Sequence, residues 1–573
     1  MVSILRVDLR TLRSSLQPAP AAYDGLGGRC LTSRIVADEV PPRCDPLGPD
    51  NRLVFAPGLL GGTNASSSGR VSVGAKSPLT GGVKESNAGG MTATRLAQLG
   101  IMALVLEGAP SADAGPFVVV VRQVDGRPET EVLSSPALAG LPTTEAAADL
   151  ATTFGPRAAF VINGPAGELL LKGAGIAHTD PEGRPCRYSA RGGLGAVMGS
   201  KRVKAIVLQV ERPRNRRAVD DAVWREAVRE YGGLIRSSPG TERFSTLGTA
   251  AMMEAVHAMG ALPHRNFGPA QFPEVEKVSG KRMREVILER DGAGTPTHAC
   301  MPGCLIRCSN IYADSDGGFL VSPMEYETNV MLGPNLGIAD LDTIARLNRQ
   351  CNELGLDTIE TGCALGVAME AGSLSFGNGH AAAEALAGVL DGTDLGTALG
   401  NGTVATAELV GATRVPVVKG QGIAGYDPRG LKGNGVTYAT SPMGADHTAG
   451  NAIGSPVDHL AAEGQVELSR SQQIKAAVLD SLGLCSFTKA VSLGNLPLVA
   501  RLAGAMGGRP VSADDLLRAG RDTVLLEREF NRRAGMTEAD DRLPQFFAVE
   551  PLAPHMTVWD VPDEDLDAMW KDE

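Results

Sequence analysis

The apolar pattern of this 573-residue chain changes near residue 211, and this change restricts the fold more than any other feature. Before it, short apolar or β-branched runs alternate with clusters of glycine, serine and proline, which is typical of strands joined by turns. Two further windows, 91–99 and 145–154, are predicted helices, and Thr143 or Thr144 is the predicted N-cap of the second. The predicted strands cover residues 4–9, 52–56, 102–107, 117–123, 159–163, 169–172 and 204–210.

After the polar, proline-containing stretch 211–217, apolar residues recur at the three- and four-residue spacing of helices. The window 341–354 should end at Gly355, which suits a left-handed C-cap. Ser512 and Asp515 have the spacing of a capping box in front of the last helix. A less regular, glycine-rich region, 392–435, separates the helical parts. The predicted helices cover residues 223–235, 341–354, 381–390, 467–482, 495–506 and 514–530.

These patterns predict an α+β multidomain protein. The length alone is typical of two to four domains. We expect a β-rich N-terminal domain over residues 1–212, a mainly helical domain over 213–415 and a second mainly helical domain over 416–573.

The composition excludes several classes of protein. Glycine accounts for 71 residues, above the usual share of about 7%, which indicates tight turns and places where backbone must approach something bulky. The net charge of −11 argues against a surface that follows nucleic-acid phosphates. No run of 18 apolar residues and no secretory signal pattern occurs. We therefore expect no membrane span, a cytoplasmic location and reduced thiols.

Three of the nine cysteines lie within nine residues, at Cys300, Cys304 and Cys308. Pro302 and Gly303 predict a loop for this segment. Three closely spaced thiols on a loop, with a fourth from elsewhere, are a usual ligand set for an iron–sulfur cluster. Zinc is the competing ligand, although zinc ribbons usually pair a CxxC with a second CxxC or with histidines. The residues favour a cluster over zinc by a modest margin.

A repeated hexapeptide supplies a candidate for the fourth thiol. NELGLD at 352–357 and DSLGLC at 480–485 share one frame, and each stands where a helical pattern ends. Gly355 and Gly483 would close these helices in the left-handed conformation. Two ordinary helix C-caps are the alternative interpretation. Two near-copies, one of them ending in Cys485, favour paired sites around a ligand with two similar halves.

Together with these motifs, many ordered blocks resemble the aldehyde:ferredoxin oxidoreductase family over nearly the whole chain. Members of this family hold one tungsten between two pyranopterins, next to a [4Fe–4S] cluster. The matching blocks are GLGGR (25–29), DEVPP (38–42), SGR (68–70), KSPLTGG (76–82), SNAGG (86–90), RGGLGAVMGSKRVKAI (191–206), LPHRNF (262–267), EYET (325–328), YATSPMGADH (438–447) and FNRRAG…DRLP (530–544).

The resemblance implies a β-rich N-terminal domain that binds the two pterins, and it assigns roles to individual residues. Arg70 resembles the residue that bridges cluster and pterin, and Asn87 resembles the one whose carbonyl helps hold Mg²⁺ between the two pterin phosphates. The implied cluster ligands are Cys300, Cys304, Cys308 and Cys485. The other implied cofactor-binding residues are Gly89, Gly90, Arg191, Gly192, Gly193, Asn352, Asp357, Asp480 and Leu484.

Three side chains resemble the acid and the histidine beside the metal. His447 is the implied hydrogen-bond donor to the substrate oxygen, and Glu325 or Glu327 is the implied proton acceptor. A carboxylate in that role needs a pKa raised by a poorly hydrated cavity.

The chain departs from the family pattern in three respects. Its cysteine loop reads CxxxCxxxC instead of CxxCxxxC, Asn352 replaces an aspartate, and the ExxH iron-binding pair that some members carry beyond the cysteine loop is missing. The first two changes bear on the redox potentials of the centres. The cluster itself remains compatible with one extra loop residue.

The resemblance implies oxidation of an aldehyde to a carboxylic acid at a tungsten or molybdenum bis-pyranopterin. Electrons would pass through the cluster to ferredoxin or a similar iron–sulfur carrier. One alternative is a reductive family member acting on an activated aromatic acid. Another is an electron-transfer subunit with a degenerate pterin site. The sequence leaves open the substrate, tungsten against molybdenum, the carrier, and whether the chain forms a homo-oligomer.

Overall fold

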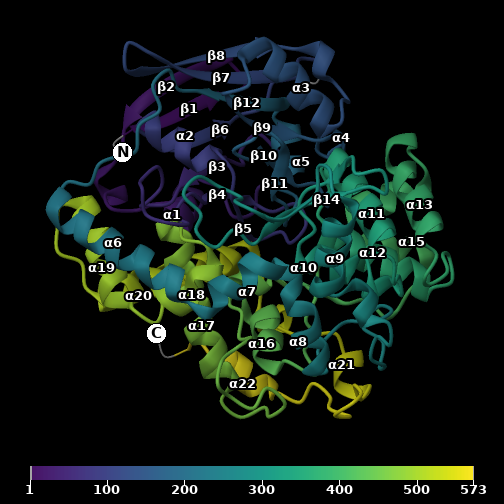
Figure 1. The fold of residues 1–573 in the computed structure, drawn as a ribbon. Coiled ribbons are helices and arrows are strands. Elements are labelled where there is room, and N and C mark those ends of the chain that lie inside the picture. The colour runs from purple at the N-terminus through teal and green to yellow at the C-terminus, as the bar shows by residue number, and fades with distance from the viewer. Residues whose placement is uncertain (1–2, 112, 572–573) are drawn as a thin grey trace.

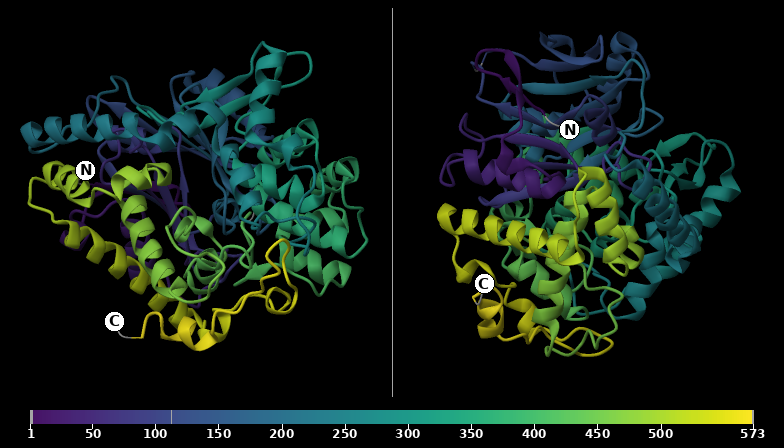
Figure 2. Two further views of the ribbon diagram at one scale, coloured as in Figure 1. Left: turned by 60° about the horizontal axis from the view of Figure 1, so that its bottom comes forward. Right: turned by 90° about the vertical axis from the view of Figure 1, so that its left-hand side faces the viewer.

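The computed structural model describes residues 3–111 and 113–571. Strands gather in the N-terminal part, and helices form most of the rest (Figure 1). Figure 2 shows the sheets on one side of the molecule and the C-terminal helices on the other. The predicted α+β class, with a β-rich N-terminal region followed by helical parts, is confirmed.

The N-terminal region begins with a six-stranded sheet of order β2-β1-β6-β3-β4-β5. Helix α1 (Gly28–Glu39) follows β2, and α2 (Thr92–Gln98) follows β5. Only β1 and β6 pair in parallel; the other neighbours are antiparallel. The strands are β1 (Ser3–Asp8), β2 (Arg13–Pro18), β3 (Leu53–Pro57), β4 (Val71–Lys76), β5 (Val83–Ala88) and β6 (Ile101–Glu107).

A second six-stranded sheet repeats this topology. Its order is β8-β7-β12-β9-β10-β11, with β7 and β12 as the parallel pair. Helices α3 (Thr143–Phe154) and α5 (Leu194–Ser200) take the positions of α1 and α2, and only the short α4 (Pro165–Glu168) has no counterpart. The chain therefore contains two copies of one ββαβββαβ unit. The strands are β7 (Phe117–Val124), β8 (Arg127–Ser134), β9 (Ala159–Asn163), β10 (Ile176–Thr179), β11 (Pro185–Ser189) and β12 (Val203–Gln209).

Successive side chains of each strand point to opposite faces of its sheet. The apolar residues therefore form one core between the two sheets and one further core on the outer face of each sheet. Leu53 and Phe55 of β3 share one core with Val161 of β9, and α2 and α5 contribute to it. Val54 of β3 faces the opposite way, toward α1, and Phe160 of β9 likewise packs against α3. The two sheets thus enclose one core and are each covered by a helix, because side chains point to opposite faces along a strand.

Most of the strand and helix predictions for this region are confirmed, with two corrections. The predicted strand 169–172 is a turn after α4, in which Leu169 and Leu170 are exposed. The predicted N-caps Thr143 and Thr144 are wrong, because α3 already begins at Thr143 and Pro142 occupies the cap position.

The predicted helices of the second part are confirmed, including the C-cap Gly355 at φ 77° and the capping box at Ser512. The glycine-rich region 392–435 is more regular than expected, because α14, α15 and the start of α16 lie in it. The helices are α6 (Asp221–Ser237), α7 (Pro239–Leu247), α8 (Met252–Ala258), α9 (Gly280–Arg290), α10 (Tyr326–Met331), α11 (Leu341–Leu354), α12 (Thr358–Glu370), α13 (Gly379–Asp391), α14 (Asp394–Asn401), α15 (Thr403–Val410), α16 (Lys432–Thr440), α17 (Gln465–Leu482), α18 (Lys489–Ser492), α19 (Leu496–Gly507), α20 (Ala513–Ala534), α21 (Phe546–Val549) and α22 (Asp563–Ala568).

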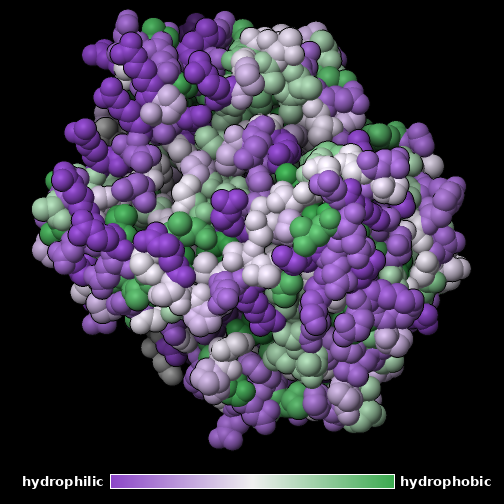
Figure 3. All heavy atoms as spheres, in the orientation of Figure 1, coloured by the Kyte–Doolittle hydropathy of each residue, from purple (hydrophilic) through white to green (hydrophobic). Residues whose placement is uncertain are grey.

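Small sheets accompany these helices, formed by β13 (Thr295–His298), β14 (Ser309–Ala313) and β15 (Phe319–Val321), and by β16 (Val417–Val418) and β17 (Gln421–Gly422). One large apolar core draws residues from both predicted helical domains, from Ala250 to Trp570. The boundary near residue 415 stays a prediction. The face seen in Figure 3 is mainly hydrophilic, with small separate hydrophobic groups. No helix of the described residues has the length and apolar content needed to cross a membrane.

Candidate cofactor site

The two hexapeptides dock on the two sheets in equivalent ways. Gly355 O accepts a hydrogen bond from Gly175 N at 2.8 Å, and Gly483 O accepts one from Arg70 N at 3.2 Å. Gly175 and Arg70 each stand directly before the equivalent strands β10 and β4. The last residue of each hexapeptide also donates, from Asp357 N to Gly173 O at 3.1 Å and from Cys485 N to Ser67 O at 2.9 Å. The pairing predicted from the sequence thus has a structural counterpart in the duplicated sheets.

Close backbone contact at these two docking points requires glycine. A Cβ on Gly58, just after β3, would lie 2.1 Å from Gly483 N, and one on Gly164, just after β9, would lie 2.4 Å from Leu354 O. Both distances are far below contact. The amide of Leu484 is used inside its own turn, donating to Leu479 O at 2.9 Å, so only its carbonyl and side chain remain for a ligand.

The cysteine loop 300–308 lies against the first sheet beside the second hexapeptide. Cys300 O accepts from Gly90 N at 2.9 Å, and a Cβ on Gly89 would stand 3.4 Å from Cys300 Sγ. Cys304 Sγ accepts from Ser67 Oγ at 3.8 Å, and Ser67 O in turn holds Cys485 N. Cys304, Cys308 and Cys485 belong to one buried cluster, and Cys300 packs against it. The structure thus brings all four predicted cluster cysteines together, as free thiols.

The sulfurs do not form a compact zinc-like group in this structure. Zinc binds thiolates at about 2.3 Å in a tetrahedron, which brings the sulfurs to roughly 4 Å from one another. Among the residues that the structure describes, no three of the cysteine sulfurs lie within 4.8 Å of one another. A hydrogen bond from the Cys300 thiol lowers the pKa of Cys304.

Arg70 and Asn87 lie together at the edge of the cysteine group. Arg70 Nη2 donates to Asn87 O at 3.0 Å, and its Nε donates to the Asn87 side chain. The charge of Arg70 also acts on Cys485, whose pKa is raised by burial and lowered by the guanidinium. The predicted bridging residue is thus adjacent to both a cluster cysteine and the predicted Mg²⁺-binding carbonyl.

Arg191 lies on the other half of the site and is fully engaged with protein atoms. Its Nε donates to Asp357 Oδ2 at 3.1 Å, and its other nitrogens donate to Ala445 O and Gly422 O, both at 2.6 Å. Gly192 and Gly193 follow at φ 82° and 75°, a conformation that favours glycine. This segment can turn its backbone amides toward a phosphate, while the Arg191 guanidinium orients Asp357.

The first residues of the two hexapeptides differ in their surroundings. Asp480 is 3.7 Å from Arg29 Nη1, and burial raises its pKa well above the usual range. The backbone carbonyl of Asn352 accepts hydrogen bonds from Tyr188 Oη at 2.6 Å and from Thr143 Oγ1 at 3.0 Å. An asparagine therefore stands where the other half has an acid next to an arginine.

The structure separates the two candidate glutamates. Glu327 Oε1 lies 3.4 Å from His447 Nε2, and Glu327 Oε2 accepts from Gly425 N at 2.7 Å. Glu325 points elsewhere: Thr249 Oγ1 donates to it at 2.5 Å, and Arg187 Nη1 is 3.8 Å away. Burial raises the pKa of Glu327, and the His447 charge offsets part of that rise.

Aromatic residues surround the Glu327–His447 pair. The Tyr426 ring is 5.6 Å from the His447 ring and 5.1 Å from that of Tyr326. Three buried polar atoms here have no hydrogen-bond partner within the described part of the chain: Glu327 Oε1, His447 Nδ1 and Tyr438 Oη. Because buried polar groups are normally paired, these atoms fit a site that receives a bound group.

Arg187 was not predicted from the sequence. It lies on β11, four residues before Arg191, and is buried against the cysteine loop, where Ser309 Oγ accepts from its Nη1 at 2.7 Å. A lone arginine in a strand gives no spacing signal, so only the fold reveals its place.

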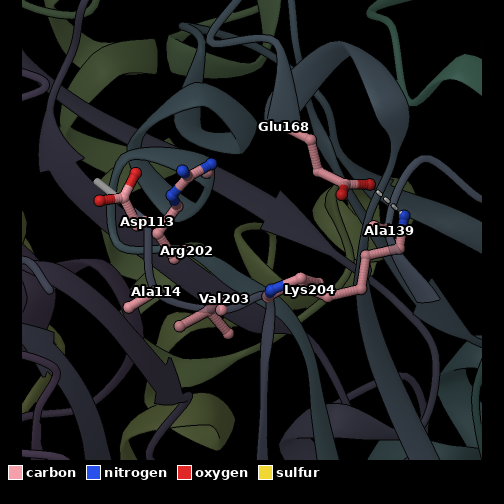
Figure 4. A pocket seen from close by; sticks show the side chains of 10 residues that line it. Asp113, Ala114, Ala139, Glu168, Arg202, Val203 and Lys204 are labelled. Atoms are coloured by element: carbon pink, nitrogen blue, oxygen red, sulfur yellow. Dashed lines mark hydrogen bonds and ion pairs between the residues drawn. The ribbon is translucent and has the colours of Figure 1, made fainter. Parts of the chain in front are cut away.

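Two pockets lie away from these residues. One of about 120 Å³ is shown in Figure 4, where Lys204 reaches toward Glu168. Another, of about 400 Å³, lies beside Arg290 and Tyr312. Neither contains a residue predicted for the site, so the chemistry of the side chains, and not pocket size, identifies the candidate centre.

Comparisons with known proteins identify the family of this chain. The family model described as aldehyde ferredoxin oxidoreductase, N-terminal domain, matches residues 4–210, and that for domains 2 and 3 matches residues 226–572. The tungsten-containing aldehyde ferredoxin oxidoreductases of Thermococcus kodakarensis and Pyrococcus furiosus are each 32% identical, covering 96% of this chain and 91% of theirs.

Two more distant similarities are to proteins with other printed activities. The aliphatic sulfonate oxidoreductase, WOR-like subunit, of Pyrococcus furiosus is 24% identical, covering 92% of this chain and 86% of its own length. A solved structure of the active site complex BamBC of benzoyl coenzyme A reductase superposes with a TM-score of 0.80 at 20% identity, covering 99% of this chain and 92% of that one, which shows a shared fold. The family models and the relatives at 32% identity establish that the chain is an oxidoreductase of the aldehyde ferredoxin oxidoreductase family.

Proposed function

We propose that the protein oxidises an aldehyde to a carboxylic acid at a tungsten or molybdenum bis-pyranopterin and passes the electrons through a [4Fe–4S] cluster to ferredoxin or a similar carrier. The observation that carries this proposal is the Glu327–His447 pair, which lies among buried polar atoms without hydrogen-bond partners in the described part of the chain. Membership of the family supports the same reaction.

The residues present fit the proposed groups. Cys300, Cys304, Cys308 and Cys485 would hold the cluster, since three thiols of one loop and a fourth from the second hexapeptide gather in one buried group. The pterins would lie between the two hexapeptides, with Asp357 and Asp480 at their edges and the backbone amides at Gly89 and Gly192 at their phosphates. The Asn87 carbonyl would help hold Mg²⁺ between those phosphates.

The metal, when bound, supplies Lewis acidity and accepts two electrons as one aldehyde and one water become one carboxylic acid and two protons. The protein's part is to place the proton transfers. His447 Nε2, now 3.4 Å from Glu327, can donate to the substrate oxygen as negative charge develops on it. Glu327 can accept a proton, and its raised pKa makes it a stronger base than an exposed carboxylate.

Elemental analysis of anaerobically purified protein tests the proposal first. We expect about four irons and about one tungsten or molybdenum per chain, together with aldehyde-dependent reduction of a viologen dye. Iron alone, from cells supplied with tungstate and molybdate, would support the electron-transfer subunit. Zinc alone would contradict the assignment of the cysteines.

A reductive reaction is the second candidate. It is favoured by the fold shared with benzoyl coenzyme A reductase, while the sulfonate oxidoreductase relative adds a further substrate class. Assays of the loaded enzyme in both directions, with aldehydes and a viologen or with activated aromatic acids and a strong reductant, distinguish the candidates. Turnover only in the reductive assay would replace aldehyde oxidation as the function.

A further inference from the structure

Arg187 connects the two ends of the cysteine loop. Its Nη1 donates to Ser309 Oγ at 2.7 Å, directly after Cys308, and its Nη2 donates to His298 Nδ1 at 3.2 Å, two residues before Cys300. The side chain comes from β11 and is only 6% exposed. One buried guanidinium thus holds both strands, β13 and β14, between which the loop extends.

A second hydrogen bond orients this guanidinium. Arginine can only donate, so His298 Nδ1 must accept, and the ring proton lies on Nε2. Nε2 then donates to Glu182 Oε2 at 2.7 Å. The hydrogen-bond chain Glu182–His298–Arg187 runs from a half-exposed carboxylate to the cysteine loop. Both terminal nitrogens of Arg187 have an acceptor, while its buried Nε has no partner among the described residues. The orientation of Arg187 is therefore fixed by partners outside the proposed metal ligands.

These contacts place two charged groups beside the cysteine loop. Arg187 is held between His298 and Ser309, which flank the segment from Cys300 to Cys308, so a buried positive charge lies at the base of the loop. The Glu325 carboxylate lies 3.8 Å from Arg187 Nη1. The cation and the anion of one ion pair thus lie at the same end of the loop.

We propose that Arg187 is a positioning residue that keeps loop 300–308 closed and, by its charge, raises the reduction potential of the cluster, with Glu325 offsetting part of that effect. Reduction adds one negative charge to the cluster, and a buried cation stabilises the more negative state. The inference rests on the proposed function only in requiring that the four cysteines hold a cluster.

The test is a redox titration of the holoenzyme followed by electron paramagnetic resonance, with iron release to a chelator as a second measurement. We expect Arg187→Met to lower the midpoint potential and to speed iron release. Arg187→Lys should keep the potential close to that of the natural protein, because the charge remains, but should still speed iron release, because one ammonium cannot reproduce the two directed bonds. Glu325→Gln should raise the potential.

Arg122→Met provides the control. Arg122 lies on β7, near the opposite edge of the same sheet, and pairs with the exposed Glu131 at 2.8 Å, so its loss should leave the cluster potential unchanged. Equal potentials for the natural protein, Arg187→Met and Glu325→Gln would overturn the electrostatic part, and unchanged iron release in both Arg187 variants would overturn the positioning part. If Arg187→Met does not fold, Arg187→Lys and Glu325→Gln still decide both parts. A natural protein without a cluster signal would instead contradict the proposed function.

Discussion

Glu327 and His447 form a pair across the proposed substrate site, with Oε1 and Nε2 3.4 Å apart, although 120 residues separate them in the chain. Glu325, two residues away in sequence, belongs to a different group of side chains. Glu325 occupies the N-cap position of α10, whereas Glu327 lies in the first turn of that helix. Residues two apart on a helix do not face the same way, so one glutamate points to His447 and the other to Arg187.

Replacing Glu327 by glutamine should lower turnover without releasing the metal. A positioned general base contributes typically 10²–10⁴-fold to a rate, so we expect a decrease of about that size in kcat. The measurement is aldehyde-dependent dye reduction, normalised to the tungsten or molybdenum content. Glu325→Gln is the matched comparison and should affect turnover less. Loss of metal from Glu327→Gln would contradict the assigned role.

The pH dependence of turnover should reflect the raised pKa of Glu327. The carboxylate form is the active base, so kcat/KM should rise with pH as Glu327 loses its proton. Because burial raises that pKa, the rise should occur above the ordinary glutamate value of about 4.3. A pH profile of kcat/KM between pH 4 and 9 checks this. The same limb persisting in Glu327→Gln would assign the titration to another group.

Replacing Cys485 by serine should reduce the iron content, whereas Cys351→Ser should not. Both cysteines are buried, but only Cys485 lies beside the loop 300–308. Iron analysis and the electron paramagnetic resonance spectrum of the reduced protein measure the difference. Equal iron in both variants would remove Cys485 from the ligand set.

Gly58→Ala should displace the second hexapeptide from the first sheet. The new Cβ would meet Gly483 N at 2.1 Å, and only a backbone shift could relieve that contact. We expect lower cofactor content and a lower unfolding temperature. Gly233→Ala on α6 is the control, since no atom lies within 4 Å of its Cβ position, and alanine favours a helix by about 1 kcal/mol. A Gly58→Ala protein with full metal content would show that this close approach is not needed.

Lys84→Met should destabilise the fold next to His447. Lys84 Nζ lies 2.5 Å from Asp446 Oδ2, and both side chains are almost fully buried. Removing one partner of such a pair leaves a buried charge and costs about 3–5 kcal/mol. Chemical denaturation of the apo and loaded protein measures the change. The double variant Lys84→Met, Asp446→Asn should recover part of the lost stability; no recovery would mean that the unpaired charge is not the cause.

The sequence predicted the elements whose patterns are local. The long amphipathic helix α20 has its capping box at Ser512, and α11 ends at Gly355, as expected. Helices and strands that do not have one apolar and one polar face were not predicted from the sequence. Helix α12 is buried on nearly all sides and shows no polar stripe, while β2 is exposed along its whole length and shows no apolar alternation. Leu169–Leu171 is apolar in sequence, yet Leu169 and Leu170 face outward.

The candidate site could be predicted only where residues of one motif act together. The resemblance and the repeated hexapeptide anticipated the grouping of the four cysteines, including Cys485 from far along the chain. The resemblance and the hexapeptide could not distinguish Glu325 from Glu327, because the direction in which each side chain points depends on where α10 begins. They also gave no sign of Arg187, because only the folded chain shows its side chain reaching from β11 to Ser309 at the start of β14.

The duplicated sheets give the molecule two equivalent docking points. The hexapeptides bound there differ in their last residue. The hexapeptide at the second sheet ends in Asp357, whose carboxylate binds Arg191, and the one at the first sheet ends in Cys485, whose sulfur joins the cysteine loop. Two identical halves would offer electrons two equivalent routes out of a group bound between them. Because one hexapeptide ends in a carboxylate and the other in a thiol, the proposed cluster can form beside only one half, and electrons would leave on that side.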